Sequence, residues 1–194
     1  MKKMKSTLPN MVVVLVIVAI VASGVLAWVH KATEAPKQAV AQQSLNNDIK
    51  AVMGGKQVKE ICADTIHKSF DGKDYEFIVH DVEYTSGDVA GKAVESTEMG
   101  FGGKLIVLVG LDLDGNILGY AIRQTSETPG LGVKAADWFQ KGGKGDIIGM
   151  NPLNKNFTVS KDGGEVDAIT ASTITSRAFL KAVKNAAEAV SNSK

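Results

Sequence analysis

Five hydroxyl side chains lie within the eleven residues from Asp167 to Arg177, which read DAITASTITSR and precede a helical pattern. One hydroxyl is enough to cap a helix start, because its oxygen accepts a hydrogen bond from an amide of the first turn. A helix start also presents free N–H groups and the positive end of the helix dipole, which together favour phosphate. Hydroxyls at Thr170, Ser172 and Thr175 would add donors around such a phosphate. A threonine beside it would be placed for esterification.

The sequence gives less support to a metal site, a nucleotide-binding loop or a nucleophilic serine. The histidines, His30, His67 and His80, have no partner at the spacing of a metal site, so no metal is expected. The GFGGK stretch at Gly100–Lys104 lacks the third glycine of a dinucleotide loop and the spacing of a Walker loop. A serine nucleophile is also disfavoured, since the G-x-S-x-G elbow is missing and no nearby histidine can act as base. We therefore assign no catalytic residue.

The amino-terminal part of the chain carries an apolar run that suits a membrane. Met11–Val29 contains no charged residue, and as a helix it would extend about 29 Å, enough to cross a bilayer. Three lysines precede the run, and because positive flanks stay in the cytoplasm, the residues after it are expected on the outer side. A cleaved secretory signal, with a small-residue cleavage site near Val25 and Ala27, is the alternative.

Composition and charge are those of a globular protein with an appendage. The 194 residues have a formal net charge of +1 and no basic block interleaved with aromatic residues, which argues against nucleic acid as a partner. The single cysteine, Cys62, excludes an internal disulfide and a four-cysteine metal cluster. We expect this thiol to be buried and inert.

Hydrophobic periodicity indicates both strands and a helix. Tyr75–Tyr84 alternates and is rich in aromatic and β-branched residues, which predicts a strand. Lys104–Asp112 and Ile117–Gln124 flank the turn sequence LDGN, which predicts a hairpin rather than a calcium loop. Ser176–Ser191 has apolar residues at helical spacing and predicts an amphipathic closing helix. The remaining expected elements are a linker or helix at 30–50, a short helical or mixed segment at 51–73 and a strand at Asn156–Ser160.

The hydroxyl-rich segment resembles a motif of a known family, the FMN-binding domain shared by the G subunit of Rnf electron-transport complexes and the C subunit of sodium-pumping NADH:quinone reductase. In that family a flavin transferase joins FMN through its phosphate to a threonine within D-x-x-(S/T)-G-A-(S/T). Asp167 to Thr173 match in order, with Ala171 for the usual glycine and Ser172 for the usual alanine. The resemblance implies that Thr173 bears the FMN and that the transferase recognises Asp167 and Thr170.

Two further stretches agree with this resemblance. SETPGLG at Ser126–Gly132 resembles the family's Glu-Thr-Pro-Gly-Leu-Gly loop, which packs against the flavin ring, and GFGG at Gly100–Gly103 resembles a glycine-aromatic-glycine-glycine stretch. Leu131 would offer an apolar face to the ring, and an ordinary type II turn is the alternative interpretation of that loop. The further cofactor-binding residues so implied are Thr175, the nearest rival acceptor, with Glu127, Thr128, Pro129, Gly130, Leu131, Gly132, Gly102 and Gly103.

The resemblance implies an α+β fold, in which one FMN-binding domain with an antiparallel sheet and flanking helices follows one transmembrane helix. The expected organisation is a cytoplasmic amino terminus at 1–10, a transmembrane helix at 11–29, a membrane-proximal linker or helix at 30–50 and an extracytoplasmic FMN-binding domain at 51–194. A covalent tether suits that side of the cytoplasmic membrane, because a cofactor that dissociated there would be lost by dilution.

By the same resemblance, the chain is an electron-transfer subunit of an Rnf-type complex, which couples electron transfer between ferredoxin and NAD to the movement of sodium ions or protons. It would not be catalytic alone. Its partners would be the other subunits, the membrane and, during maturation, the flavin transferase. Two alternatives stay open: the C subunit of the quinone reductase, which resembles this chain with extra segments, and an exported flavin-free adapter or binding module of the same fold.

Overall fold

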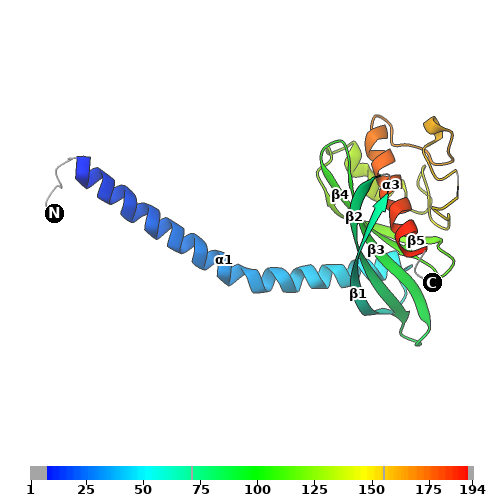
Figure 1. Cartoon of the computed structure of the whole chain (residues 1–194), viewed down its shortest axis with the longest axis horizontal. Helices are drawn as coiled ribbons and strands as arrows, with labels where there is room; N and C mark the ends of the chain where they lie inside the picture. Colours follow the sequence, from blue (N-terminus) through cyan, green and yellow to red (C-terminus); the bar gives the residue numbers. More distant parts are fainter. Residues whose placement is uncertain (1–7, 71, 155, 192–194) are drawn as a thin grey trace. The chain divides into compact units, whose positions relative to one another are not determined.

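The computed structural model describes residues 8–70, 72–154 and 156–191 (Figure 1). The chain divides into two units, Met1–Leu45 and Asn46–Lys194. The first contains most of helix α1 (Leu8–Val52), in which Pro9–Glu34 has a mean hydropathy of 3.0 and is long and apolar enough to cross a membrane. The expected apolar span at 11–29 falls within this segment, and residues 30–50, expected as a linker or helix, are helical.

The second unit is built on one antiparallel sheet. Its five strands pair in sequence order, so that each strand lies beside the next one along the chain (Figure 1). Short turns make this meander possible, and the turn after the fourth strand is closed by Asp112, whose carboxylate accepts from the amides of Asp114 and Asn116. The strands are β1 (Val58–Phe70), β2 (Lys73–Tyr84), β3 (Val89–Met99), β4 (Lys104–Leu111) and β5 (Ile117–Thr125).

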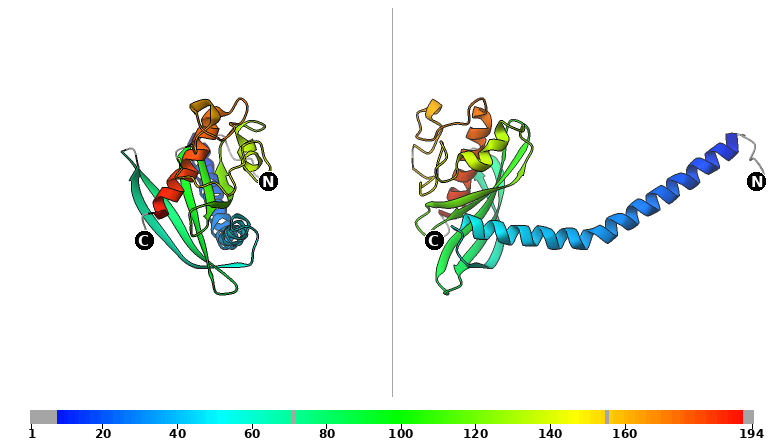
Figure 2. Two further views of the ribbon diagram at one scale, coloured as in Figure 1. Left: turned by 90° about the vertical axis from the view of Figure 1, so that its right-hand side faces the viewer. Right: turned by 180° about the vertical axis from the view of Figure 1, so that it is seen from behind.

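The main hydrophobic core lies between one face of the sheet and helix α3 (Thr173–Ser191). Alternate residues of β4 point to this face, because successive side chains of a strand lie on opposite sides. Figure 2 shows α3 lying along the strands, and its apolar residues belong to the core that the sheet lines. The buried residues that meet there include Phe77, Val94, Leu105, Val107, Val109, Phe179, Ala182, Val183 and Ala186.

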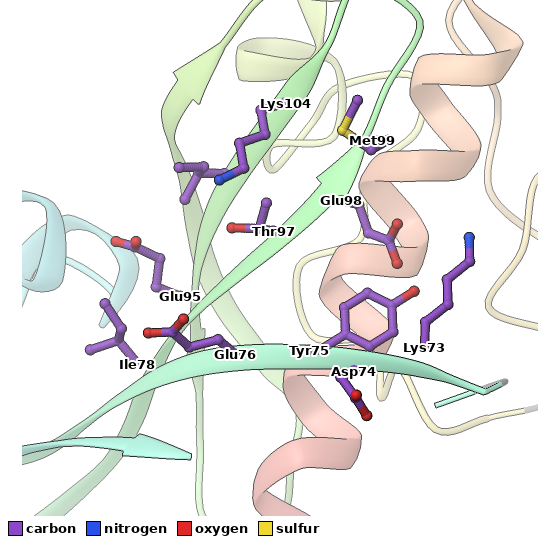
Figure 3. Close-up of a pocket in the computed structure, with 11 residues that line it drawn as sticks. Lys73, Asp74, Tyr75, Glu76, Ile78, Glu95, Thr97, Glu98, Met99 and Lys104 are labelled. Atoms are coloured by element: carbon purple, nitrogen blue, oxygen red, sulfur yellow. The ribbon is translucent and has the colours of Figure 1, made fainter. Parts of the chain in front are cut away.

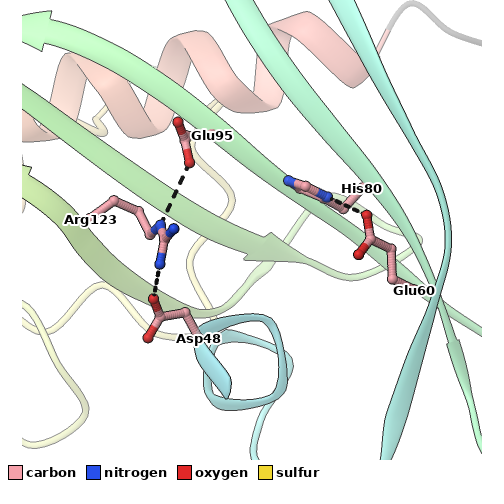
Figure 4. A network of polar contacts seen from close by, with 5 residues as sticks. All are labelled: Asp48, Glu60, His80, Glu95 and Arg123. Carbon is pink, nitrogen blue, oxygen red and sulfur yellow. Dashed lines mark hydrogen bonds and ion pairs between the residues drawn. The ribbon is translucent and has the colours of Figure 1, made fainter. Parts of the chain in front are cut away.

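The opposite face of the sheet is covered locally by the last turn of α1. Ile49, Val52 and Met53 are buried there, and the carbonyl of Val52 lies directly over Gly110. A polar network accompanies this contact, in which Arg123 bridges Asp48 and Glu95; its Nε lies 3.7 Å from Glu95 Oε2 (Figure 4). In the same view His80 Nδ1 lies 2.7 Å from Glu60 Oε1. These five polar side chains are thus partnered with one another, as burial requires.

A long connection, residues 126–172, links β5 to α3, and in its described residues the helices are short. These are η1 (Gly132–Lys134), α2 (Ala135–Trp138) and η2 (Ser160–Asp162). The connection is anchored on the core by Phe139, whose ring stacks on Phe179 with centroids 4.4 Å apart. The Tyr120 hydroxyl donates to the carbonyl of Ala135 at 2.6 Å and accepts from the amide of Phe139, and burial raises the pKa of the Tyr120 phenol. These contacts anchor an irregular segment on α3 and β5.

The expected α+β fold with an antiparallel sheet is confirmed, as are the strand at 75–84, the hairpin and the closing helix, which begins three residues earlier than expected. The helical or mixed segment expected at 51–73 is wrong, because most of it forms strand β1. The expected strand at Asn156–Ser160 is also wrong; Val159 makes only an isolated bridge to Val166. Cys62 is exposed on β1 rather than buried, and the nearby Asp64 carboxylate raises the pKa of its thiol.

Candidate functional site

Three segments far apart in the sequence line one pocket of about 410 Å³. The first is the connection between β3 and β4, the second follows β5, and the third is the turn that leads into α3. These are the segments whose motifs stand out in the sequence. The lining residues are Phe101, Glu127, Thr128, Leu131, Gly132, Ala171, Ser172, Thr173, Ile174 and Thr175.

Glu127 joins the three segments. Its side chain is buried, with 6% of the residue exposed. One carboxylate oxygen, Oε1, accepts from the amides of Phe101 at 2.7 Å and Gly102 at 3.3 Å, while Oε2 accepts from the Thr175 hydroxyl at 2.9 Å. A buried carboxylate needs such donors, because burial without them is costly. Glu127 therefore holds the glycine-rich connection against the first turn of α3.

Glycines on both sides leave room for this carboxylate. A β-carbon on Gly132 would lie 2.5 Å from Glu127 Oε2, and one on Gly100 would lie 1.9 Å from Oε1. Both separations are shorter than carbon and oxygen atoms tolerate. The glycines therefore allow close approach of the backbone to Glu127.

Apolar side chains form the rim of the pocket. A tight turn presents Leu131, whose amide donates to the carbonyl of Thr128 at 3.2 Å, with Gly130 at φ 77°. Across the pocket, Phe101 is 68% exposed and Ile174 is 53% exposed. Large apolar residues are seldom so exposed around one hollow without a ligand or partner to cover them.

Two serines of the hydroxyl-rich segment have structural roles. The Ser176 hydroxyl accepts from the amide of Ile169 at 3.0 Å and donates to the carbonyl of Ser172 at 2.9 Å. These bonds tie the turn before α3 to the first turn of the helix. Ser172 is itself buried at the pocket wall.

The two threonines at the start of α3 differ in their surroundings. Thr175 is 1% exposed, and its hydroxyl is bonded to Glu127. Thr173, the first residue of the helix, is only partly buried, and its Oγ1 accepts a hydrogen bond from Lys161 Nζ at 3.2 Å. Of these two hydroxyls, that of Thr173 is the accessible one.

Ala171 adopts a left-handed backbone conformation, with φ 61°. This conformation costs an alanine roughly 1 kcal/mol, because its β-carbon crowds the carbonyl. The resembled motif carries glycine at this position, and glycine adopts the conformation freely. The backbone of this turn thus explains the glycine of the motif, and Ala171 carries some strain in its place.

The predicted site residues divide into two groups. Eight of them line the pocket: Glu127, Thr128, Leu131, Gly132, Ala171, Ser172, Thr173 and Thr175. The other six are not among its lining residues: Gly102, Gly103, Pro129, Gly130, Asp167 and Thr170. Of these, Gly102 donates to Glu127, and the carbonyl of Asp167 accepts from Trp138 Nε1 at 2.8 Å. Thr170 is exposed.

Three residues at or near the pocket were absent from the predicted set. Phe101 is the aromatic residue of GFGG, so the resemblance itself contained the signal. Ile174 lies on the outer side of an otherwise amphipathic helix, and an exposed isoleucine there is a weak signal. Lys161 lies in an irregular segment, and no pattern in the sequence indicates that its side chain contacts Thr173.

A second hollow, of about 470 Å³, lies on β2 and β3 and serves as a comparison (Figure 3). Two of its carboxylates have partners: Glu98 accepts from Asn185 Nδ2 at 3.0 Å and lies 3.4 Å from Lys181 Nζ, while Glu95 lies against Arg123. None of the residues predicted to bind the cofactor lines it. Within the part of the chain that the structure describes, no group of three potential metal ligands occurs.

This α+β fold places one pocket between two glycine-rich connections and a helix start. Residues 100–188, which include all three segments, match the family described as FMN-binding domain. The chain is similar to the G subunit of the ion-translocating oxidoreductase complex of Yersinia pestis, with 41% identity over 100 residues, 49% of this chain and 47% of that protein. The corresponding G subunit of Aliivibrio fischeri is 38% identical over 106 residues, 52% and 50% of the two chains.

The fold is also similar to that of a solved structure, NqrC of Shewanella oneidensis. The TM-score is 0.55 at 18% identity, over 75% of this chain and 91% of that one. The chain spans about half the length of the curated relatives it matches. These comparisons confirm the resemblance to the FMN-binding domain and to the G subunits.

Proposed function

We propose that the chain is a membrane-anchored electron-transfer subunit that carries FMN in the pocket described above, esterified to Thr173. The observation that carries the proposal is the convergence of three motif-bearing segments on this one pocket, inside the region that matches the FMN-binding domain. FMN supplies one-electron and two-electron chemistry when bound, and the protein supplies its position and electrostatic surroundings.

The chemistry of the lining suits both parts of an FMN molecule. Phe101, Leu131 and Ile174 give exposed apolar surface suited to the flat ring. Thr173 stands at the positive end of the α3 dipole, which favours a phosphate. An apolar rim beside a polar helix start therefore matches a ligand with a ring at one end and a phosphate at the other.

The surroundings of the two threonines favour Thr173 as the acceptor. An ester forms on a hydroxyl oxygen, so this oxygen must be reachable and free to lose its proton. Thr175 is buried and donates its proton to Glu127, whereas Thr173 is partly exposed and its oxygen accepts from Lys161. Asp167 and Thr170 are exposed beside the same turn, as residues recognised by a flavin transferase would have to be.

Membership of an ion-translocating complex is supported by the G-subunit relatives, which at about 40% identity are closer in sequence than NqrC at 18%. On this proposal the domain lies outside the cytoplasmic membrane, with the lysine-rich amino terminus inside. Its neighbours would be the other subunits of a complex that transfers electrons between ferredoxin and NAD and moves sodium ions or protons.

The direct test is the intact mass of the chain made in cells that contain a flavin transferase, measured after denaturation. We expect a gain of one FMN less one water, and peptide mapping should place it on Thr173. An unmodified chain from such cells would favour the flavin-free adapter. A gain that maps to Thr175 would keep the flavin but move the attachment site.

A further inference from the structure

Lys161 is the basic side chain that reaches the proposed attachment site. It lies in η2, and its Nζ donates to Thr173 Oγ1 at 3.2 Å. An exposed lysine loses side-chain entropy when it is held in one position, so such a contact needs local support. The surroundings of η2 supply that support.

An ion pair fastens η2 to α3. Asp162, the residue after Lys161, accepts from Arg177 Nε at 2.7 Å and from Arg177 Nη2 at 2.6 Å. This two-point geometry fixes orientation as well as distance. The same Arg177 contact lowers the pKa of the Asp162 carboxyl, so the pair stays ionised at neutral pH. Backbone bonds add to it, since the amide of Ser160 donates to the carbonyl of Val166 at 2.8 Å.

The positive charge of Lys161 is not compensated by the two carboxylates of Asp162 and Glu127. Asp162 and Arg177 compensate each other, and the carboxylate of Glu127 is directed to amides and to Thr175. A phosphate that bridges a flavin and a threonine retains one negative charge. Its free oxygens would be two bonds away from Thr173 Oγ1, the atom that the ammonium already contacts.

We propose that Lys161 is the cationic ligand of the FMN phosphate, held in place by the Asp162–Arg177 pair. This inference rests on the proposed function, because it assigns a residue to the phosphate end of the same pocket. An ammonium contact to an ionised phosphate oxygen is a charge-assisted hydrogen bond, stronger than its contact to a neutral hydroxyl. Lys161 would thus recognise the phosphate and not the flavin ring.

The test compares two ligands that differ only in the phosphate. The full chain is made without a flavin transferase and purified in detergent, and its affinities for FMN and riboflavin are measured by flavin fluorescence. We expect the unmodified chain to prefer FMN, and Lys161→Met to reduce this preference roughly fivefold. Lys161→Arg should retain it. Lys134→Met, a change of an exposed lysine in η1, is the matched control and should leave the preference unchanged.

A second measurement uses the flavinylated chain. It tests the role of Lys161 even if free flavin binds too weakly for the affinities to be compared. The phosphorus NMR resonance of the phosphoester should shift in Lys161→Met and return toward its original position in Lys161→Arg. An unchanged resonance together with an unchanged FMN preference in Lys161→Met would overturn the inference. A native chain that neither acquires covalent FMN nor binds free FMN would overturn the proposed function instead.

Discussion

The first turn of α3 and the rest of the same helix face different surroundings. Beyond Ser176 the helix is a hydrophobic element, with Phe179 fully buried between Tyr120 and Phe139. The first turn carries hydroxyls and lines the pocket. Since the body of the helix is packed against the sheet, its first turn is presented in one orientation. The core thus positions the site, while the polar turn supplies its chemistry.

The largest expected effect is the loss of covalent FMN, and it should occur on substitution of Thr173 but not of Thr175. Thr173→Val should abolish covalent FMN, because valine keeps the shape of threonine but has no oxygen to form the ester. Thr173→Ser should retain the flavin as the control. Thr175→Val should also retain it, at a cost of about 1–2 kcal/mol in unfolding free energy, because Glu127 loses a donor. Intact mass after denaturation measures the first effect, and covalent flavin persisting in Thr173→Val would exclude this acceptor.

A change in the body of α3 should show the opposite pattern. Phe179→Ala would leave a cavity where the ring stacks on Phe139, and we expect the unfolding free energy to fall by about 3–5 kcal/mol. Urea denaturation followed by circular dichroism measures this change. Thr173→Val, examined in the same way without flavin, should differ from the original chain by less than about 0.5 kcal/mol. Equal losses of unfolding free energy in the two variants would show that the first turn contributes as much to stability as the body of the helix.

Removal of Glu127 should affect both properties, because it links the glycine-rich connection to the helix. Glu127→Ala leaves the amides of Phe101 and Gly102 and the Thr175 hydroxyl without their acceptor, and should lower the unfolding free energy by about 2 kcal/mol. The flavinylated fraction should fall as well, as read by mass. Glu127→Gln keeps an acceptor oxygen and is the milder control. A normal flavinylated fraction in Glu127→Ala would show that flavin attachment does not need the hydrogen bonds of Glu127.

The smallest effect concerns the turn before the helix. Ala171→Gly relieves the left-handed strain but makes the unfolded chain more flexible, so we expect a net gain of about 0.5 kcal/mol or less in unfolding free energy. Ala136, in the exposed part of α2, has no such strain, so Ala136→Gly should lower the unfolding free energy by about 0.5–1 kcal/mol. The measurement is the difference between these two variants in urea. Equal destabilisation by both would mean that Ala171 is not strained.

Regular elements with one buried face were predictable from the sequence. Strand β2, the β4–β5 hairpin and α3 show alternation or helical spacing that burial imposes. Strand β1 has no such pattern, because most of its residues are exposed at the sheet edge, and this also explains the exposure of Cys62. Residues 156–160 contain apolar Phe157 and Val159, but these anchor an irregular connection instead of a ladder.

The site was predictable only through motifs. Spacing within DAITASTITSR suggested a phosphate at a helix start, and the resemblance added the two glycine-rich connections. Nothing local in the sequence indicates that Glu127 accepts from Thr175, or that Lys161 reaches Thr173. Both contacts depend on how the connection folds back over α3. They are tertiary contacts between irregular segments, for which no periodicity exists.

The burial of Thr175 has a consequence for the biogenesis of the protein. In an unfolded chain the hydroxyls of residues 170–176 are all exposed and chemically alike, so a modifying enzyme would depend on sequence alone to choose among them. In the folded chain Thr175 and Ser176 are withdrawn, and Thr173 is presented at the helix start. On the proposed function, folding before modification would restrict flavin attachment to Thr173, and the order of membrane insertion, folding and flavin transfer would determine how uniformly the flavin is attached.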